Sequence, residues 1–146
     1  MLRAAAVDAR IEEFPDGTPT AADAAKAVGC TRAEIVKSLV FVCDGLPVLA
    51  LVPGDKRADA QRLSAAAGAG YARVAKAEEV VSATGFEPGA VAPFPVPNVS
   101  RVLMDRSLMR HELVWIGAGS DCHMAGLFPS DLARLAKAEI GDIAEA

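Results

Sequence analysis

Two short apolar runs, residues 34–43 and residues 47–52, dominate the middle of the chain. Branched apolar runs of this length, bounded by turn residues, are typical of buried strands. Because Asp44 and Gly45 lie between the two runs, we expect the strands to pair antiparallel as a hairpin. A capping-box pattern at 31–34 predicts a single helical turn just before the first strand.

Lys37 interrupts the first of these strands, where an ammonium group is unusual. Burying a charge in an apolar medium is costly unless the charge is paired or the site opens to water. Either Lys37 lies at the start of the strand and extends its ammonium group into solvent, or the strand borders a wet cleft in which the lysine acts. Both interpretations are compatible with the strand pattern.

Periodic patterns elsewhere predict short helices and further short strands. Helices are expected between capping and stop residues at 2–14, 21–28, 59–67, 77–84 and 132–138. Strands are expected at 71–74, 99–104, 113–117 and 123–128. These elements predict a single domain over residues 1–146, with an N-terminal helix within 1–17 and a frayed tail over 139–146.

Residues 85–97 form a predicted loop that holds four prolines and two glycines among its thirteen residues. Proline fixes φ and lacks an amide donor, so this composition excludes a regular helix or strand. The amides near Gly89 can approach a ligand closely because glycine carries no side chain. The segment is therefore either a rigid ligand-binding loop or a stiff connector.

The composition is that of a globular chain. Of the 146 residues, 52% are hydrophobic and 23% are charged, a balance that excludes a disordered chain. We expect a cytoplasmic protein, because no signal-peptide pattern and no apolar run of membrane-spanning length is present. The net charge of −4 argues against non-specific coating of nucleic acid. Residues 56–111 nevertheless carry a net charge of +3, which suits either local docking of one polyanion or a solvated face.

The three cysteines, Cys30, Cys43 and Cys122, are odd in number and widely spaced. This spacing supports neither a disulfide framework nor a zinc site, and no metal or cofactor is predicted. Neighbours on a strand point to opposite faces, so Cys122 and His123 are not expected to form a catalytic dyad. The glycines at 117–119 have the wrong spacing for a dinucleotide-binding fingerprint.

An ordered series of short motifs runs through the chain. The motifs are the alanine-rich segment 21–30, the Lys37 strand 35–41, Val-Pro-Gly-Asp at 52–55, Thr-Gly-Phe-Glu-Pro-Gly at 84–89 with Pro93 and Phe94 after it, Asp-Arg-Ser-Leu at 105–108, and the glycines of 117–119 before Pro-Ser-Asp-Leu at 129–132. In this order and spacing the series resembles the YbaK/ProX (YbaK/EbsC) family, the free-standing relatives of the editing domain inserted in bacterial prolyl-tRNA synthetases. The resemblance covers residues 18–135.

The resemblance implies a single α+β domain with a mixed, partly barrel-like sheet surrounded by helices. It also implies an enzyme, an aminoacyl-tRNA deacylase that hydrolyses the ester linking a wrong alanine or cysteine to tRNA(Pro). The implied partners are the acceptor end of tRNA(Pro) and prolyl-tRNA synthetase. No membrane, metal or cofactor is implied.

Site residues follow from the same resemblance. Lys37 matches the family lysine and is the candidate catalytic residue, because its ammonium group could hold the terminal phosphate or polarise the ester carbonyl. The candidate substrate-binding residues are Gly85, Pro88, Gly89, Asp105, Gly117, Gly119 and His123. Amides of 85–89 would complete an oxyanion pocket, and Asp105 would either orient the lysine or loop, or close a turn at its strand end. Pro95 stands where many members have the glycine of Pro-Phe-Gly, which stiffens this end of the loop.

Two alternatives stand beside the deacylase. One is a non-catalytic module that binds tRNA or a synthetase, and the other is an esterase that acts on a small aminoacyl compound. Retention of Lys37 and of the Gly-x-x-Pro-Gly loop favours the deacylase, because an adaptor would need neither.

Overall fold

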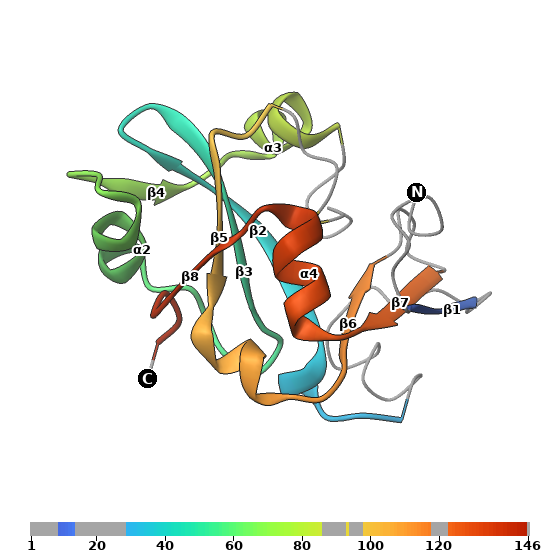
Figure 1. Ribbon diagram of the computed structural model, residues 1–146. Coiled ribbons are helices and arrows are strands. Elements are labelled where there is room, and N and C mark those ends of the chain that lie inside the picture. The colour runs from blue at the N-terminus through green and yellow to red at the C-terminus, as the bar shows by residue number, and fades with distance from the viewer. Residues whose placement is uncertain (1–8, 14–28, 86–92, 94–97, 118–122, 146) are drawn as a thin grey trace.

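The structure, a computed structural model, combines two β-sheets with short helices in an α+β fold (Figure 1). It describes residues 9–13, 29–85, 93, 98–117 and 123–145. The strands are β1 (Ala9–Glu13), β2 (Val36–Cys43), β3 (Leu46–Pro53), β4 (Ala72–Val74), β5 (Arg101–Asp105), β6 (Val114–Gly117), β7 (His123–Leu127) and β8 (Glu139–Gly141). The helices are α2 (Ala60–Ala67), α3 (Ala77–Thr84) and α4 (Pro129–Ala136), with the 3₁₀ turns η1 (Arg32–Glu34) and η2 (Arg106–Arg110).

The larger sheet is mixed, as predicted, and has the strand order β4-β2-β3-β5-β8. Its centre is the predicted hairpin, in which β2 and β3 pair antiparallel along their whole lengths. Asp44 and Gly45 form the turn with φ values of 50° and 83°. Two successive left-handed residues match the twist of the flanking strands, which explains why an Asp-Gly pair stands here. On the far side of the hairpin, β3 pairs parallel with β5, and β5 pairs parallel with β8.

The smaller sheet is antiparallel and has the order β1-β7-β6. An isolated parallel bridge between Ile35 and Trp115 links it to the start of β2. Within the described residues this bridge is the only strand pairing between the two sheets, and they do not close into a barrel. The expectation of a partly barrel-like sheet is therefore replaced by two sheets joined by one bridge and packed against each other through a shared core.

Apolar side chains pack on both faces of the larger sheet. On one face, Leu49 and Met104 pack with α3, with Leu132 of α4 and with the smaller sheet. On the other face, Phe41 packs with Leu63 of α2 and with the C-terminal segment. Figure 1 shows α4 in front of the larger sheet and α2 beside β4. A sheet covered on both faces explains why β2 and β3 are continuous apolar runs rather than alternating ones.

Local capping chemistry places the described helices close to where the sequence predicts them. Asp59 precedes α2, and its carboxylate accepts hydrogen bonds from the amides of Gln61 at 2.9 Å and Arg62 at 3.1 Å. Gly68 and Gly85 end α2 and α3 in the left-handed conformation that favours glycine. Within the described part of the chain, no helix is long and apolar enough to span a bilayer.

The predicted N-terminal helix is wrong for residues 9–13, which form strand β1. This strand pairs antiparallel with β7, from Ala9 opposite Leu127 to Glu13 opposite His123. Strand pairing over a distance of more than a hundred residues overrides the local helical pattern, because the edge of β7 offers backbone partners that an isolated segment lacks. The remainder of that predicted helix and the predicted helix 21–28 lie outside the described residues.

The predicted frayed tail is also wrong. Residues 139–141 form β8, which pairs with β5 so that Met104 lies opposite Ile140. Beyond the strand, Ile143 is fully buried and Ala144 is 4% exposed. Short strands of this kind carry little signal of their own, and long-range pairing with β5 creates this one.

Replacing Gly126 by alanine is expected to lower the free energy of unfolding by about 1–3 kcal/mol, the usual effect of overpacking. Gly126 of β7 lies opposite Trp115 of β6, and a Cβ atom at position 126 would lie 3.1 Å from three atoms of the indole ring. Trp115 is only 4% exposed, so the ring has little room to move. Chemical denaturation of the variant would measure the change, with Ala125→Gly as a comparison that removes volume instead. An unchanged midpoint for Gly126→Ala would contradict the prediction.

Candidate active site

Lys37 is the second residue of β2 and lies half-buried on the sheet face covered by α2. Its neighbour across the hairpin is Val52, which is fully buried. The ammonium nitrogen Nζ donates a hydrogen bond to the carbonyl oxygen of Lys56 at 2.5 Å. Lys37 is therefore neither freely extended into solvent nor enclosed without a partner, because a backbone carbonyl holds its charged end in place.

A cavity of about 330 Å³ lies beside this lysine. Its polar lining comes from Lys37, Ser38 and Arg57. Its apolar lining consists of Leu39, Val40, Phe41, Ala58, Val74, Ala75 and Val80. A small concave site with an apolar wall and a few polar groups is typical of small-ligand binding.

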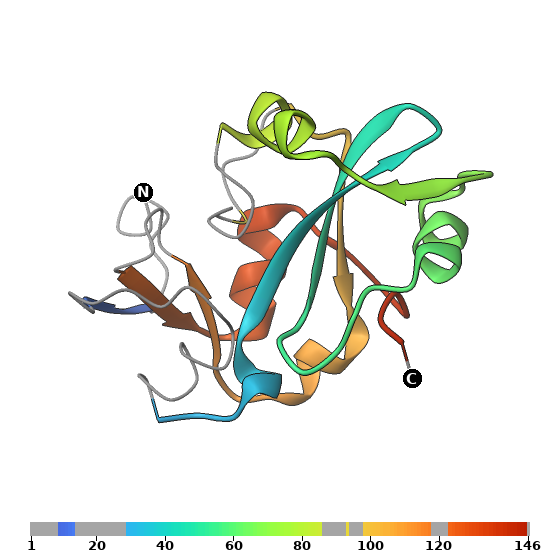
Figure 2. The same cartoon turned by 180° about the vertical axis from the view of Figure 1, so that it is seen from behind.

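The cavity follows the outer edge of β2. Strand β4 pairs only with the last part of β2, from Phe41 to Cys43, and β6 pairs with the chain only at the isolated bridge to Ile35, just before β2. Between these two contacts, the bond from the amide of Ala75 to the carbonyl of Val40, at 3.0 Å, joins β2 to the start of the α3 segment. Figure 2 shows this edge of β2, drawn in blue, running between β4 above and η1 below. Incomplete coverage of β2 within the described residues is what opens a site next to Lys37.

Positive charge is concentrated around Lys37. Burial lowers the pKa of Lys37 below the usual lysine range, and the charges of Arg57 and Arg32 lower it further, against the opposing carboxylate of Asp55. The fold thus holds an ammonium group where its charged form is disfavoured. Such a shift, together with a cavity, is typical of a functional group. A more acidic ammonium group is also a stronger hydrogen-bond donor toward a developing negative charge.

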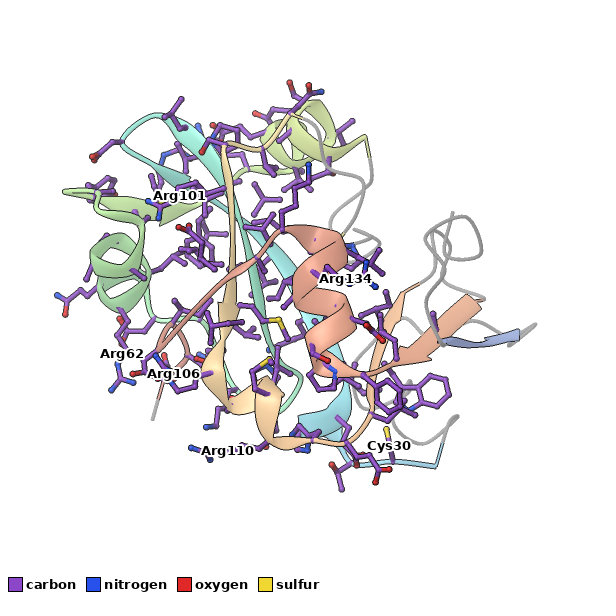
Figure 3. The ribbon with its side chains drawn as sticks, viewed as in Figure 1. Cys30, Arg62, Arg101, Arg106, Arg110 and Arg134 are labelled. Carbon is purple, nitrogen blue, oxygen red and sulfur yellow. The ribbon has the colours of Figure 1, made fainter. Side chains whose placement is uncertain are left out.

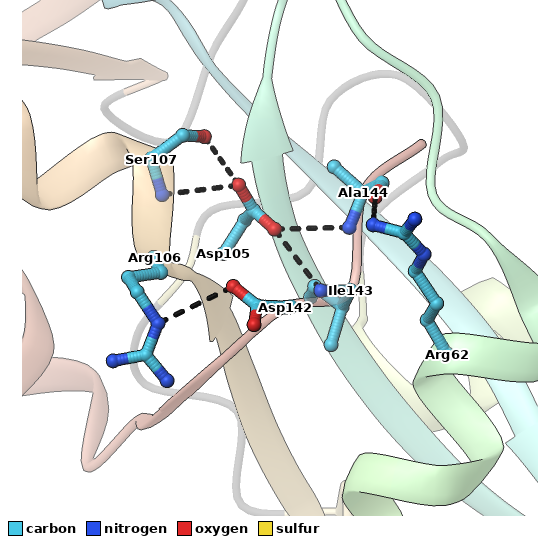
Figure 4. Close-up of polar contacts among 7 residues, drawn as sticks. All are labelled: Arg62, Asp105, Arg106, Ser107, Asp142, Ile143 and Ala144. Carbon is cyan, nitrogen blue, oxygen red and sulfur yellow. Dashed lines mark hydrogen bonds and ion pairs between the residues drawn. The ribbon is translucent and has the colours of Figure 1, made fainter. Parts of the chain in front are cut away.

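Asp105, a predicted substrate-binding residue, ends β5 and is only 5% exposed. One carboxylate oxygen, Oδ1, accepts hydrogen bonds from the amides of Ile143 at 3.0 Å and Ala144 at 2.9 Å. The other, Oδ2, accepts from the amide of Ser107 at 3.1 Å and from the Ser107 hydroxyl (Figure 4). Burial by itself would raise the pKa of Asp105, but these hydrogen bonds outweigh it and hold the pKa below the usual range.

These contacts give Asp105 a structural role, as the turn-forming alternative predicted, and none of them reaches Lys37. The carboxylate fixes the C-terminal segment, which in turn fixes the segment after β3. The amide of Asp59 donates to the carbonyl of Ile143 at 2.8 Å, and the amide of Glu145 donates to the carbonyl of Arg57 at 2.8 Å. Asp105 therefore supports, at one remove, the segment whose carbonyl holds Lys37.

The other predicted site residues are only partly described. Gly85 ends α3 with φ of 78°, and its amide donates to the carbonyl of Val81 at 2.8 Å. Gly117 ends β6 and His123 begins β7, so these two lie at the same end of the smaller sheet. Pro88, Gly89 and Gly119 lie outside the described residues. Among the described members of the predicted set, Lys37 is the one that lines the 330 Å³ cavity.

Sequence reasoning missed the contribution of the segment after β3. Lys56 supplies the carbonyl that holds Lys37, and Arg57 lines the same cavity. The hairpin register contains the signal, because pairing of Val36 with Pro53 brings residues 54–57 beside the start of β2. The described residues contain no cluster of three or more histidine, cysteine or acidic side chains that could bind a metal ion.

An α+β domain that places a half-buried lysine and an arginine in one small cavity has the charge to suit an anionic ligand. Comparison with known proteins identifies the family. The aminoacyl-tRNA editing domain family matches residues 15–135, nearly the span that the motif series predicts, and the chain belongs to this family.

Individual relatives agree with this assignment. The chain is 30% identical to the uncharacterized protein YwhH of Bacillus subtilis (strain 168) over 131 residues, which cover 89% of this chain and 83% of that protein. It is 29% identical to the proline–tRNA ligase of Streptococcus equi subsp. zooepidemicus (strain H70) over 141 residues, 96% of this chain but only 22% of the ligase. The chain thus matches about a fifth of that much longer protein.

Solved structures show the same fold. The crystal structure of the hypothetical protein APE2540 superposes with a TM-score of 0.91 at 31% identity, over 99% of this chain and 96% of that one. A protein proposed to be a trans-editing enzyme for prolyl tRNA synthetase superposes with a TM-score of 0.87 at 32% identity, over 99% of this chain and 92% of that one. The predicted α+β fold is confirmed, and the domain is an editing domain related to proline–tRNA ligases.

Proposed function

We propose that this chain is an aminoacyl-tRNA deacylase that acts in trans and removes alanine or cysteine wrongly attached to tRNA(Pro). The observation that carries the proposal is the ammonium group of Lys37, held by the Lys56 carbonyl beside a cavity of about 330 Å³. Membership of the editing-domain family and similarity to a proline–tRNA ligase support the reaction type and the choice of tRNA.

The proposed reaction is hydrolysis of the ester between the amino acid and the terminal ribose. Water adds to the carbonyl carbon, and the carbonyl oxygen takes up negative charge in the tetrahedral intermediate. Lys37 stabilises that charge by donating a hydrogen bond, which requires its protonated form. The bond between the carbonyl carbon and the ribose oxygen then breaks, and the proton from water ends on the ribose hydroxyl. The products are the free amino acid and uncharged tRNA.

The hydrogen bond to Lys56 prepares Lys37 for this role. A donor that is already oriented needs little reorganisation when charge develops on the substrate, and this lowers the barrier of the chemical step. The amides of residues 86–89 are proposed as further donors of the oxyanion pocket, because the amide of Gly85 already donates to the carbonyl of Val81. Gly85, at the left-handed end of α3, is where the chain leaves the helix toward that loop.

The size of the cavity fits a small amino acid. A synthetase pocket separates side chains that differ by one methylene by only about 1–3 kcal/mol, so smaller amino acids are attached by mistake and need a second site for removal. Apolar side chains from β2, β4 and α3 line the site and would restrict it by volume. In this proposal the partners are the acceptor end of tRNA(Pro) and, during handover, prolyl-tRNA synthetase.

A single-turnover comparison of tRNA(Pro) charged with alanine, cysteine, serine or proline tests the proposal. We expect hydrolysis of the alanine and cysteine esters, with alanine slightly favoured because the described lining of the cavity offers no obvious partner for a thiol. The prolyl ester should react roughly five- to 160-fold more slowly, since its ring adds strain of roughly 1–3 kcal/mol in a packed pocket. Equal rates on all four esters would remove the size argument. Hydrolysis of none would favour the binding module, or an esterase for small aminoacyl compounds if such compounds are cleaved.

A further inference from the structure

Arg57 and Arg32 differ from the paired arginines of the described chain. Arg101 forms an ion pair with Glu139 at 2.7 Å, and Arg106 forms one with Asp142 at 3.3 Å, which Figure 4 marks with a dashed line. Figure 3 shows where the two arginines lie. The guanidinium groups of Arg57 and Arg32, in contrast, have neither an ion pair nor a hydrogen bond within the described residues, and both side chains are exposed. Positive groups without an acidic partner are available to an anionic ligand.

Arg57 lies where a ligand of Lys37 would be, and Arg32 adds a positive charge that acts on the same lysine. Arg57 lines the same cavity as Lys37, and the charges of both arginines act on the ammonium group. Asp55 is the acidic group that acts on it. Lys37, the two arginines and Asp55 together carry a net charge of +2, although the whole chain carries −4. The local field therefore attracts an anion to a protein that is otherwise acidic.

The backbone around Arg57 is fixed more firmly than its exposure suggests. The Arg57 carbonyl accepts from the amide of Glu145 at 2.8 Å, and Ala58 forms an antiparallel bridge with Ala144. Ala144 is in turn held by the buried carboxylate of Asp105. A guanidinium group on a fixed backbone offers a planar fork that matches two oxygens of a phosphate, whereas an ammonium group acts as a point charge.

The two cations of the cavity therefore suit different parts of one substrate. The Lys37 ammonium group is half-buried and already donates to a backbone carbonyl, which suits a single fixed carbonyl oxygen. Arg57 is exposed, and none of its guanidinium donors is used by a described residue, which suits a solvated phosphodiester. In an aminoacylated nucleotide the ester and the 5′ phosphate are attached to the same ribose, so one cavity can hold both.

We propose that Arg57, assisted by Arg32, binds the 5′ phosphate of the terminal nucleotide and that Lys37 acts on the ester carbonyl. This assignment rests on the proposed function for the ester, but the phosphate site itself requires only a nucleotide. It predicts that recognition depends on the phosphate next to the esterified ribose, and that Arg57 governs binding more than the chemical step.

The test measures two properties of the full chain, binding of adenosine 5′-monophosphate against adenosine and hydrolysis of Ala-tRNA(Pro). The variants are Arg57→Gln, Arg57→Lys and Arg32→Gln. Arg134→Gln is the matched control, because it removes one exposed arginine on α4, which covers the opposite sheet face. Thermal unfolding of each variant checks that its fold is retained.

For Arg57→Gln we expect at least tenfold weaker binding of the monophosphate, unchanged binding of adenosine, and a KM raised at least tenfold with kcat within threefold. Arg57→Lys should be intermediate, Arg32→Gln should be weaker in effect, and Arg134→Gln should match the wild type. For uncharged tRNA, the slope of the logarithm of the binding constant against the logarithm of the salt concentration should become shallower in Arg57→Gln by about one phosphate contact. The slope should not change in Arg57→Lys, which keeps the charge, or in Arg134→Gln.

The outcomes separate this inference from the proposed function. If the wild type hydrolyses Ala-tRNA(Pro) but Arg57→Gln keeps the same KM and monophosphate affinity, the phosphate site is refuted and the deacylase stands. If kcat falls while KM is unchanged, Arg57 acts in the chemical step and the assignment is wrong. If the wild type hydrolyses no ester but binds the monophosphate, and Arg57→Gln loses that binding, the phosphate site stands and the deacylase proposal fails.

Discussion

Replacing Lys37 by alanine is expected to slow hydrolysis of Ala-tRNA(Pro) at least a hundredfold under single-turnover conditions, with the fold intact. Removal of one preorganised oxyanion donor costs about 2.7–4 kcal/mol in the chemical step. The fold should persist because the side chain is only half-buried and makes one described hydrogen bond, to the Lys56 carbonyl. A folded Lys37→Ala protein with near-wild-type turnover would contradict the mechanism.

Two further variants make this test specific. Lys37→Arg keeps the charge but not the position of the donor, so its rate should also fall at least tenfold. Lys76→Ala is the control, because Lys76 is exposed at the start of α3 and its side chain makes no cap hydrogen bond. The rate of this control should lie within twofold of the wild type.

The pH dependence of the rate gives a second measure of the same group. The mechanism requires protonated Lys37, so activity should be lost as pH rises through the pKa of Lys37. Burial and the charges of Arg57 and Arg32 lower that pKa. The alkaline loss should therefore occur below the value of about 10.4 that an unperturbed lysine would give. In Arg57→Gln, which removes one positive charge, the alkaline limb should move to higher pH.

Replacing Asp105 by alanine is expected to lower the free energy of unfolding by about 3–5 kcal/mol, because each buried donor left without an acceptor costs about 1–3 kcal/mol. The donors concerned are the amides of Ile143 and Ala144, together with the amide and hydroxyl of Ser107. Asp105→Asn keeps one acceptor oxygen and should lose less. Urea denaturation at pH 7 measures both variants, and a loss below 1 kcal/mol for the alanine variant would show that these contacts are not needed.

The Asp105 carboxylate also predicts how stability changes with acid. Its pKa is lower in the folded protein than in the unfolded chain, where it is about 3.9. Its contribution is therefore complete above the unfolded pKa and is lost as pH falls through the folded pKa. Over this acidic range, the unfolding free energy of the wild type should fall more steeply than that of Asp105→Asn. Parallel curves for the two proteins would contradict this linkage.

Loss of Asp105 should reach the active site as well. The released C-terminal segment no longer supports Arg57 and the carbonyl that orients Lys37. Turnover of Asp105→Asn should therefore fall even at temperatures where the protein remains folded. Equal turnover for the folded variant and the wild type would show that residues 54–57 hold their position without the C-terminal segment.

Local chemistry in the sequence determines much of this fold. Asp44 and Gly45 define the central hairpin, since few other residue pairs accept two successive left-handed conformations. Asp59 and Gly68 bound α2 through a side-chain cap and a left-handed stop. Lys37 can also be singled out from the local sequence, because a charge among branched apolar residues is costly to bury unless it is paired or reaches water. The ordered motif series indicates the family, which the family match confirms.

Tertiary structure decides the features that depend on partners far away in the chain. Strand β1 forms by pairing with β7, and β8 forms by pairing with β5. The sequence of neither segment is therefore enough to predict its conformation. Asp105 is structural because the amides of residues 143 and 144 fold back onto it. Arg57 joins Lys37 in one cavity because the hairpin register returns the chain to the start of β2. Sequence patterns report nearest neighbours along the chain, whereas these groups meet only when the sheet has formed.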